Sequence, residues 1–541
     1  MQSQRQLYKA FQKTNPEKFN QDLIYMREKE SHDLHSYFDD LFKSLKLPGI
    51  KYLSSKTITN EAEFVEFLPN EFRAIEENRL DLISAKFELS HGDESKEYDL
   101  NIFFPKLIDD FFFQLAGNRY CAVYQLTDRN FYPVSNGVSL KTLLMPLTLR
   151  TSKFEFTTMD GEVISCNDFT LDFFNSKAKN ADIRNMFTFF IIKFGGVQKA
   201  LDFLFENDKM EELTGCKNVY LTDNLLNIDE SIYTVVGLKG GGKPLYLVYR
   251  EPSKSHPNKQ AFFNLLGTII KLLAGVRKTL ETIDDEAFWK RKILRNATTK
   301  LAKADQTMKA LERVYDTRTQ KNLREVEESE RESVYHLIRW MVMNFDALTT
   351  IDSVDVYNRR IRLYEYMLYP LLTKLSDASY RIFNSRTMDV KRLETVFSNI
   401  GPMFIVKRLM TNELFRYTNS TSTLDLFASG LRWSARGPQA LGGGGENVAT
   451  SMRSVHPSYM GVIGLTNASA SQPGLTGTFC PMTDMIDGMF FEEPGREAKD
   501  IYYQGVEEGF FDETKEILLA SLSEHDSISE ESHHLLEASH H

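Results

Sequence analysis

The hydrophobic period changes along this chain, and that change constrains its fold more than any other feature of the sequence. Apolar residues recur at helical spacing from Gln260 to about Met343 and again from Val356 to about Thr418. Strand-like alternation instead marks 98–126 and the PLYLVYR segment at 244–250. The 541 residues suffice for about three or four domains. The sequence therefore predicts a multidomain α+β protein.

Charge is distributed unevenly along the chain. With 65 Lys and Arg against 75 Asp and Glu, the formal net charge is −10, which argues against a simple basic coat for nucleic acid. Residues Lys290–Arg324, however, hold 11 Lys and Arg against 3 Asp and Glu, a local charge of +8. This segment is either the solvated face of helices or a phosphate-facing surface. Negative charge collects in Glu507–Glu531, so the mean charge is a poor guide to what one surface binds.

Two glycine-rich segments invite functional interpretations. Residues 419–480 are rich in Gly, Ser, Thr and Ala, which is typical of functional loops, and four consecutive glycines at 442–445 indicate a sharp bend or a close backbone approach to a ligand. Gly237–Lys243 fits the start of a phosphate-binding P-loop. Pro244 stands where that loop needs Ser or Thr for Mg²⁺, and a strand-like segment follows instead of a helix. A glycine hairpin is therefore the expected structure.

Nothing in the sequence indicates a secreted, zinc-binding or membrane protein. The four cysteines are at least 45 residues apart, which predicts neither a disulfide framework nor a zinc site. The most apolar stretch, Phe262–Val276, is broken by Lys271 and is too short to span a bilayer. The N-terminus lacks the apolar core of a signal peptide. We expect an intracellular protein with no membrane partner and no metal ligands of its own.

Three separated stretches carry motifs of a known family. They are residues 104–126 (FPKLIDDFFFQLAGNRYCAVYQL), residues 351–368 with the run NRRIR, and residues 439–477 with ALGGGG followed by RSVHP. In this order they resemble the β subunit of cellular multisubunit DNA-dependent RNA polymerases. The residues in register are Pro105, Asp109, Phe113, Gly117, Val123, Gln125, Leu126, Asn358, Arg359, Arg360, Arg362, Ala440, Leu441, Gly442, Gly444, Gly445, Arg453, Val455, His456, Pro457 and Gly461.

The departures from the family are also informative. Arg119-Tyr120 stands where the family has Glu-Arg, and the family's TPEGPNIGL is reduced to Ala468–Leu475 without its Glu. A cellular β subunit is much longer, and the active-centre motifs of its second half do not occur here. The chain therefore resembles the N-terminal half of a split β subunit, of the kind encoded by giant (jumbo) bacteriophages.

The resemblance implies three regions on the upper jaw of a polymerase cleft. Residues 1–126 and 363–415 would form the protrusion, and residues 127–350 would form the lobe with its long basic helical stretch. Residues 351–362 and 416–541 would form the fork region with its acidic C-terminal tail. In the family the fork lies beside the RNA–DNA hybrid, where the downstream strands separate.

The resemblance also implies which side chains meet nucleic acid. Guanidinium groups suit phosphate oxygens, although internal ion pairs are the alternative for the arginines at 359–362. His456-Pro457 is expected to order its loop rather than perform acid–base chemistry. The predicted nucleic-acid contacts are Arg359, Arg360, Arg362, Arg436, Arg453, Lys290, Arg291 and Lys292. The predicted loop beside the hybrid includes Gly442, Gly443, Gly444, Gly445, His456, Pro457 and Gln472.

The family reaction is nucleotidyl transfer, in which a 3′-hydroxyl attacks the α-phosphate of an NTP between two Mg²⁺ ions. In the family the Mg²⁺ ligands lie in β′, and no DFDGD-like run occurs here. We therefore expect this chain to hold no catalytic residue and no cofactor, and to be inactive alone.

The resemblance also implies partners and a location. The expected partners are the C-terminal half of β, the β′ subunit or its halves, a promoter-specificity subunit, the DNA template, the RNA transcript and NTPs. The expected location is the cytoplasm of an infected bacterial host, with packaging in the virion left open. The alternative function is a non-catalytic structural or regulatory phage protein that keeps the β fold.

Overall fold

The computed structural model describes residues 34–490 except for short internal segments. These are 74–76, 92, 109–111, 145, 174–183, 209–210, 212–215, 227, 230, 239–243, 253–257, 277, 294–301, 326–329, 384–388, 438–452, 465–473, 481–482, 484 and 487–488. The acidic stretch Glu507–Glu531 therefore lies outside the described residues.

Two separate hydrophobic cores organise the described residues. One core is built from residues of 38–126 and 356–479, together with Leu143. The other is built from residues of 131–348. Helices and several sheets occur together, which confirms the multidomain α+β prediction. Residues on both sides of 131–348 in the sequence share the first core, so the second core is inserted into the first.

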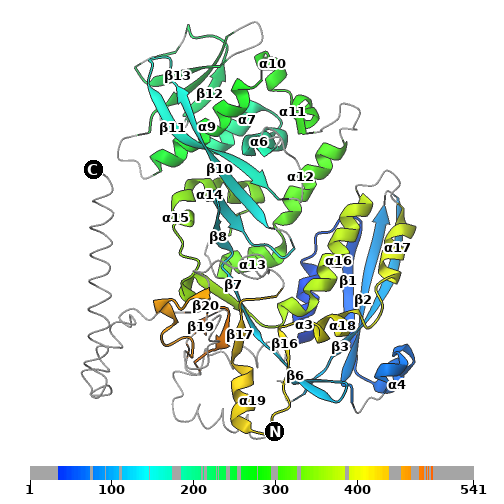
Figure 1. Cartoon of the computed structure of the whole chain (residues 1–541). Coiled ribbons are helices and arrows are strands. Elements are labelled where there is room, and N and C mark those ends of the chain that lie inside the picture. Colours follow the sequence, from blue (N-terminus) through cyan, green and yellow to red (C-terminus); the bar gives the residue numbers. More distant parts are fainter. Residues whose placement is uncertain are drawn as a thin grey trace, which may run out of the picture.

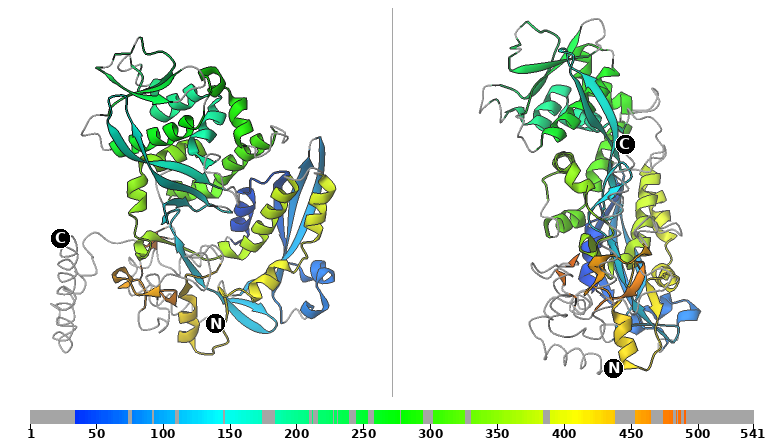
Figure 2. Two further views of the ribbon diagram at one scale, coloured as in Figure 1. Left: turned by 45° about the horizontal axis from the view of Figure 1, so that its top comes forward. Right: turned by 60° about the vertical axis from the view of Figure 1, so that its left-hand side comes forward.

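We call residues 34–128 and 351–490 the framing unit and residues 129–350 the inserted unit (Figure 1). The chain passes from one to the other after strand β7 (Tyr124–Asp128) and returns after helix α15 (Phe345–Thr349). In Figure 2 the inserted unit lies above the framing unit in both views.

A three-stranded antiparallel sheet of order β1-β2-β3 forms one side of the framing unit. Residues of β2 alternate between core and surface, as in a half-buried strand. The Phe87 ring on β2 lies 5.7 Å from that of Phe42 and 5.2 Å from that of Phe397, so helices far apart in sequence pack on one sheet. The elements are α3 (Leu34–Lys43), β1 (Ile50–Ile58), α4 (Glu61–Phe64), η1 (Val65–Phe67), η2 (Asn70–Phe72), β2 (Leu80–His91), β3 (Glu94–Pro105), α16 (Glu365–Phe383), α17 (Val390–Ser398) and α18 (Phe404–Met410).

The centre of the framing unit is a six-stranded sheet of order β18-β17-β7-β15-β20-β19. Strand β7 pairs antiparallel with β15 and parallel with β17. A four-stranded sheet of order β16-β6-β5-β4 adjoins it, because β6 runs into β7 with one residue between them. The remaining elements are β4 (Leu107–Ile108), β5 (Phe112–Leu115), β6 (Asn118–Ala122), η3 (Val356–Asn358), β15 (Arg359–Arg362), β16 (Phe415–Tyr417), α19 (Thr423–Gly430), β17 (Arg432–Ser434), η5 (Pro457–Tyr459), β18 (Thr476–Thr478), β19 (Met485–Ile486) and β20 (Met489–Phe490).

The inserted unit combines two antiparallel sheets, of orders β11-β10-β9-β8 and β12-β14-β13, with a group of helices. Helix α9 is buried along most of its length and packs against β10 and β11. The elements are β8 (Phe131–Val134), β9 (Gly137–Leu140), β10 (Leu147–Thr157), β11 (Val163–Asp172), α6 (Met186–Phe194), α7 (Val197–Phe205), β12 (Val219–Thr222), β13 (Tyr233–Leu238), β14 (Leu245–Arg250), α9 (Lys259–Ala274), α10 (Leu280–Ile283), α11 (Glu286–Ile293), α12 (Ala302–Val314), α13 (Thr317–Glu325) and α14 (Val334–Met343).

The predicted helical region at 260–343 is confirmed, but its basic part is not one continuous helix. Lys290–Arg324 is divided among α11, α12 and α13, and 294–301 lie outside the described residues. Asp316 explains the break before α13. Its carboxylate accepts hydrogen bonds from the Thr319 backbone N–H and from the Thr319 hydroxyl, both at 2.7 Å, which caps the start of a new helix.

The expected glycine hairpin is also confirmed. Strand β13 pairs antiparallel with β14, with Leu238 opposite Leu245, and a strand follows Pro244 where a P-loop needs a helix. Within this segment, 239–243 lie outside the described residues.

Gly137→Ala is expected to destabilise the inserted unit by about 2 kcal/mol, because overpacking against backbone cannot be relieved by a rotamer change. A Cβ at Gly137 would lie 2.2 Å from the Leu149 carbonyl oxygen on the neighbouring strand. Gly237→Ala is the matched control, since that strand glycine has no atom within 4 Å of such a Cβ. Thermal unfolding of both variants checks this expectation, and equal melting temperatures would contradict it.

Candidate nucleic-acid interface

Two of the three stretches that carry the family motifs pair at strand β7, and the third joins the same sheet through β18. The first stretch ends in β7, and the second supplies β15, which pairs with it in the register Arg362↔Gln125. The third stretch is bracketed by β17 and β18, and Ser434 of β17 pairs with Gln125 on the other side of β7. One sheet therefore brings together residues that are hundreds of positions apart.

Arg359 is completely buried at the start of β15. Its Nε donates to the Ser353 carbonyl at 3.0 Å, and its Nη1 donates to the Tyr459 hydroxyl at 3.1 Å. The guanidinium also lies over the Tyr459 ring, 5.9 Å from the centroid. These contacts join η5 to the segment that precedes β15.

Arg360 and Arg362 share one buried carboxylate on the opposite face of β15. Glu365 accepts from Arg360 Nη2 at 3.2 Å and from Arg362 Nη1 at 3.4 Å. Arg362 Nε also donates to Gln125 Oε1 at 2.6 Å. Arg360 and Arg362 thus have the internal ion pairs of the alternative interpretation, whereas Arg359 bonds a carbonyl and a hydroxyl. Phosphate binding by them stays a prediction, and their burial does not favour it.

His456 and Pro457 lie in a loop that is tied to the segment before β15. The His456 ring nitrogen Nδ1 lies 2.8 Å from Ser458 Oγ, and Nε2 lies 3.5 Å from Asp352 Oδ2. Ser458 Oγ accepts from the Val356 backbone N–H at 2.9 Å. These contacts tie the loop to the segment before β15.

Three partly exposed arginines form a surface group that we call the arginine patch: Arg416, Arg432 and Arg436. Partial burial, with the positive charges of Arg432 and Arg436 close by, lowers the pKa of Arg416. Two carboxylates lie at the edge of the patch, since Arg432 pairs with Asp425 at 3.8 Å and Arg436 pairs with Glu413 at 3.9 Å. A group of partly exposed guanidinium groups suits a phosphate backbone.

An exposed aromatic side chain lies on the other face of β16. Tyr417 follows Arg416 and is 56% exposed, and its ring meets that of Tyr120 edge-on at 6.1 Å, while the ring of Phe415 stacks on Tyr120 at 5.1 Å. Because successive strand residues point to opposite faces, Arg416 points away from this aromatic group. Neither Arg416 nor Arg432 stands out in the sequence, because only the pairing of β16 with β6 and of β17 with β7 brings them together.

The other predicted contacts lie elsewhere or outside the described residues. Arg453 is partly buried, and its carbonyl accepts from Gly474 N at 2.9 Å. The predicted loop residues Gly442, Gly443, Gly444, Gly445 and Gln472 fall outside the described ranges.

The predicted basic residues of α11 lie in the inserted unit. Lys290 pairs with Glu286 at 2.5 Å and with Asp305 at 2.7 Å, and these carboxylates raise its pKa. Lys292 lies over the Trp289 ring, whereas Arg291 is exposed. Part of the basic segment is thus engaged inside the unit, and both interpretations of its remaining surface stay open.

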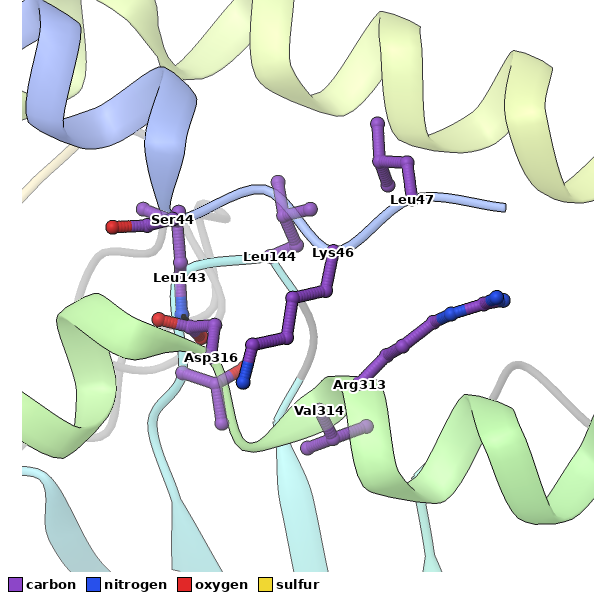
Figure 3. Close-up of a pocket in the computed structure, with 9 residues that line it drawn as sticks. Ser44, Lys46, Leu47, Leu143, Leu144, Arg313, Val314 and Asp316 are labelled. Carbon is purple, nitrogen blue, oxygen red and sulfur yellow. Dashed lines mark hydrogen bonds between the residues drawn. The ribbon is translucent and has the colours of Figure 1, made fainter. Parts of the chain in front are cut away.

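A small cavity of about 20 Å³ lies where the two units meet (Figure 3). It is lined by Lys46 and Leu47 of the framing unit and by Leu143, Arg313 and Asp316 of the inserted unit. Lys46 Nζ donates to the Tyr315 carbonyl at 3.0 Å. The volume suits about one water molecule, so the cavity is too small for a substrate. It belongs to the joint, as we call this contact between the two units.

Neither a metal-binding cluster nor a membrane-spanning helix is found among the described residues. No three His, Cys, Asp or Glu side chains there gather into a group that could hold a metal ion. No helix of the same ranges is long and apolar enough to cross a bilayer.

Comparisons with known proteins identify the family. No curated protein matches the chain. A family model described as "Non-virion RNA polymerase subunit" matches residues 3–498, which is nearly the whole chain. The match agrees with the polymerase motifs that meet at β7. The chain therefore belongs to the non-virion RNA polymerase subunit family.

Proposed function

We propose that this polymerase subunit is the N-terminal half of a split β subunit, forming one wall of the nucleic-acid cleft and the fork beside the RNA–DNA hybrid. Membership of the family makes the chain part of a nucleotidyltransferase complex, with other polymerase subunits as partners. The observation that carries the finer proposal is the pairing of the first two β-like stretches at β7, in a sheet that the third stretch joins through β18. Segments that are far apart in the sequence and carry motifs of one family thus lie in or beside one sheet.

The arginine patch supplies the contact with nucleic acid in this proposal. Arg416, Arg432 and Arg436 hold the phosphate backbone. The buried arginines of β15 keep the sheet together instead. Arg436 stands two residues before the segment that contains the glycine quartet, so bound phosphates would lie close to that loop.

The chemistry belongs to the assembled enzyme. We assign the Mg²⁺ that nucleotidyl transfer requires to a partner subunit with an Asp-rich loop, together with the catalytic carboxylates. The further partners in the proposal are the C-terminal half of β, β′ or its halves, a promoter-specificity subunit, template, transcript and NTPs. The location is the cytoplasm of the infected host, and the family description favours an enzyme that is not packaged in the virion.

Reconstitution tests this assignment. The purified chain is expected to make no RNA alone, and to be required for RNA synthesis when the other polymerase subunits are present. Mass spectrometry of the co-purified complex should find chains that carry the C-terminal β motifs and the Asp-rich loop. RNA synthesis at full rate without this chain would contradict the proposal and would favour a structural or regulatory protein that keeps the β fold.

The double variant Arg416→Gln/Arg432→Gln is expected to weaken binding of an RNA–DNA hybrid by the assembled polymerase. Each lost phosphate contact should lower the slope of log K against log salt by about 0.9. Arg408→Gln is the matched control, because that exposed arginine lies on α18 against the Phe404 ring. Fluorescence anisotropy at several salt concentrations measures the slopes. Identical slopes for the double variant and the wild type would remove the patch from the interface.

A further inference from the structure

Gln125 is a completely buried amide at the centre of β7. Its Oε1 accepts from Arg362 Nε at 2.6 Å, and its Nε2 donates to the Arg436 carbonyl at 2.7 Å. One side chain thereby joins β15 to Arg436, the second residue after β17. Both bonds are short, and one has a charged donor, which strengthens it.

The Arg362 end of this connection is itself fixed. Arg362 bonds Glu365, which also holds Arg360, and the side chains of Arg362 and Glu365 are 3% and 6% exposed. The guanidinium therefore has little freedom to follow Gln125 if β17 shifts. This series of contacts begins at the buried Glu365 and ends at Arg436 on the surface.

The Arg436 end is held by close packing as well. Gly437 has a φ of +97°, and a Cβ there would lie 2.5 Å from Leu414 Cδ1 and 3.1 Å from Gln125 Nε2. The turn after Arg436 thus rests directly on Gln125 and Leu414. The Leu414 carbonyl accepts from the Val123 backbone N–H at 2.9 Å and from the Tyr366 hydroxyl at 2.9 Å.

These contacts connect the segment that carries Arg416 to the segment that carries Arg436. Leu414 precedes β16, which carries Arg416, while Gln125 holds the carbonyl of Arg436. Residues 123–125 therefore fix the spacing between Arg416 and Arg436. Burial, and then the nearby positive charges of Arg432 and Arg436, lower the pKa of Arg416. Because like charges repel, a fixed frame is needed to keep these guanidinium groups together before phosphate arrives.

We propose that Gln125 is a positioning residue, which sets the geometry of the arginine patch for nucleic-acid phosphates through its bond to the Arg436 carbonyl. The inference rests on the proposed function, because it presumes that the patch binds nucleic acid. Gln125 itself touches no phosphate. Its effect on binding passes through Arg436 and the turn at Gly437.

Gln125→Glu in the assembled polymerase tests the proposal. A carboxylate still accepts from Arg362 but can no longer donate to the Arg436 carbonyl, so one bond of the pair is removed selectively. The slope of log K against log salt for an RNA–DNA hybrid is expected to fall by about 0.9 to 1.8, which corresponds to one or two phosphate contacts. Thr127→Val is the matched control, because Thr127 is a buried residue of the same strand that bonds Arg360 and Asp128 carbonyls instead.

A second measurement separates positioning from general destabilisation. In the Arg416→Gln/Arg432→Gln/Arg436→Gln background, Gln125→Glu is expected to cause no further loss of hybrid affinity, because the groups that it positions are gone. An equal, additive loss in that background would overturn the proposal. If Gln125→Glu does not assemble, Gly437→Ala displaces the same turn from its other side and should give the same reduced slope.

The outcomes also separate this inference from the proposed function. An unchanged slope in Arg416→Gln/Arg432→Gln would refute the patch itself. A reduced slope there, with an unchanged slope in Gln125→Glu and in Gly437→Ala, would refute only the positioning role.

Discussion

Replacement of Glu365 by glutamine is expected to lower the free energy of unfolding of the framing unit by about 3–5 kcal/mol, the usual cost of breaking a buried ion pair. Glu365 is 6% exposed and contacts both Arg360 and Arg362, whose side chains are 10% and 3% exposed. Glutamine keeps the shape but removes the charge. Two buried guanidinium groups then lose the carboxylate that they share.

Native-state hydrogen exchange of the β7 and β15 amides measures this loss locally. Glu97→Gln is the matched control, because the Lys86–Glu97 pair is 3.1 Å long but Glu97 is 65% exposed. Exposed pairs contribute about 0–1 kcal/mol, so protection should change little. A loss below about 1 kcal/mol in Glu365→Gln would show that the buried arginines do not depend on this carboxylate.

The sequence predicts the fold well wherever a hydrophobic period or a motif is local. The hairpin after Gly237 and the helical character of 260–343 follow from local patterns. The helical pattern from Val356 to about Thr418 is only partly right, because it contains strands β15 and β16, which form through pairing with β7 and β6. The end of α12 does not, because it depends on how the Asp316 carboxylate bonds Thr319 and the Leu143 backbone N–H across the chain. A single acidic residue inside a helical pattern carries no signal of that contact.

The candidate site is predicted less completely. The motifs identify the strands that meet, yet the same run of arginines is compatible with phosphate binding and with burial. Burial becomes visible only when Glu365 and Gln125 are placed beside β15. Conversely, Arg416 and Arg432 lie in different elements with no shared motif, and strand pairing alone makes them neighbours.

Raising the pH from about 8 to 10.5 is expected to stabilise the joint between the two units through Lys141. Its ammonium group lies 3.9 Å from Asp128 Oδ2, the last residue of β7. Burial, together with the nearby charges of Arg362 and Arg360, lowers the pKa of Lys141 to about 8, although Asp128 opposes the shift. Burial likewise raises the pKa of Asp128, so both groups resist the charged state.

The direction in which the free energy of unfolding changes with pH follows from proton binding by the folded and unfolded states. In the unfolded chain Lys141 has its ordinary pKa of 10.5, so between pH 8 and 10.5 the unfolded state binds more protons than the folded state. The free energy of unfolding therefore rises with pH across this window. A shift of this size corresponds to about 3 kcal/mol, at about 1.4 kcal/mol for each pKa unit.

The double variant Lys141→Met/Asp128→Asn removes both titrating groups and serves as the reference. Chemical unfolding at pH 7.5, 8.5, 9.5 and 10.5 should show the wild type gaining up to about 3 kcal/mol relative to this variant. Tyrosines titrate in the same range in both proteins, so the difference between the two profiles isolates the pair. Parallel profiles would mean that Lys141 keeps an ordinary pKa, and that the interior beside β7 accommodates its charge without cost.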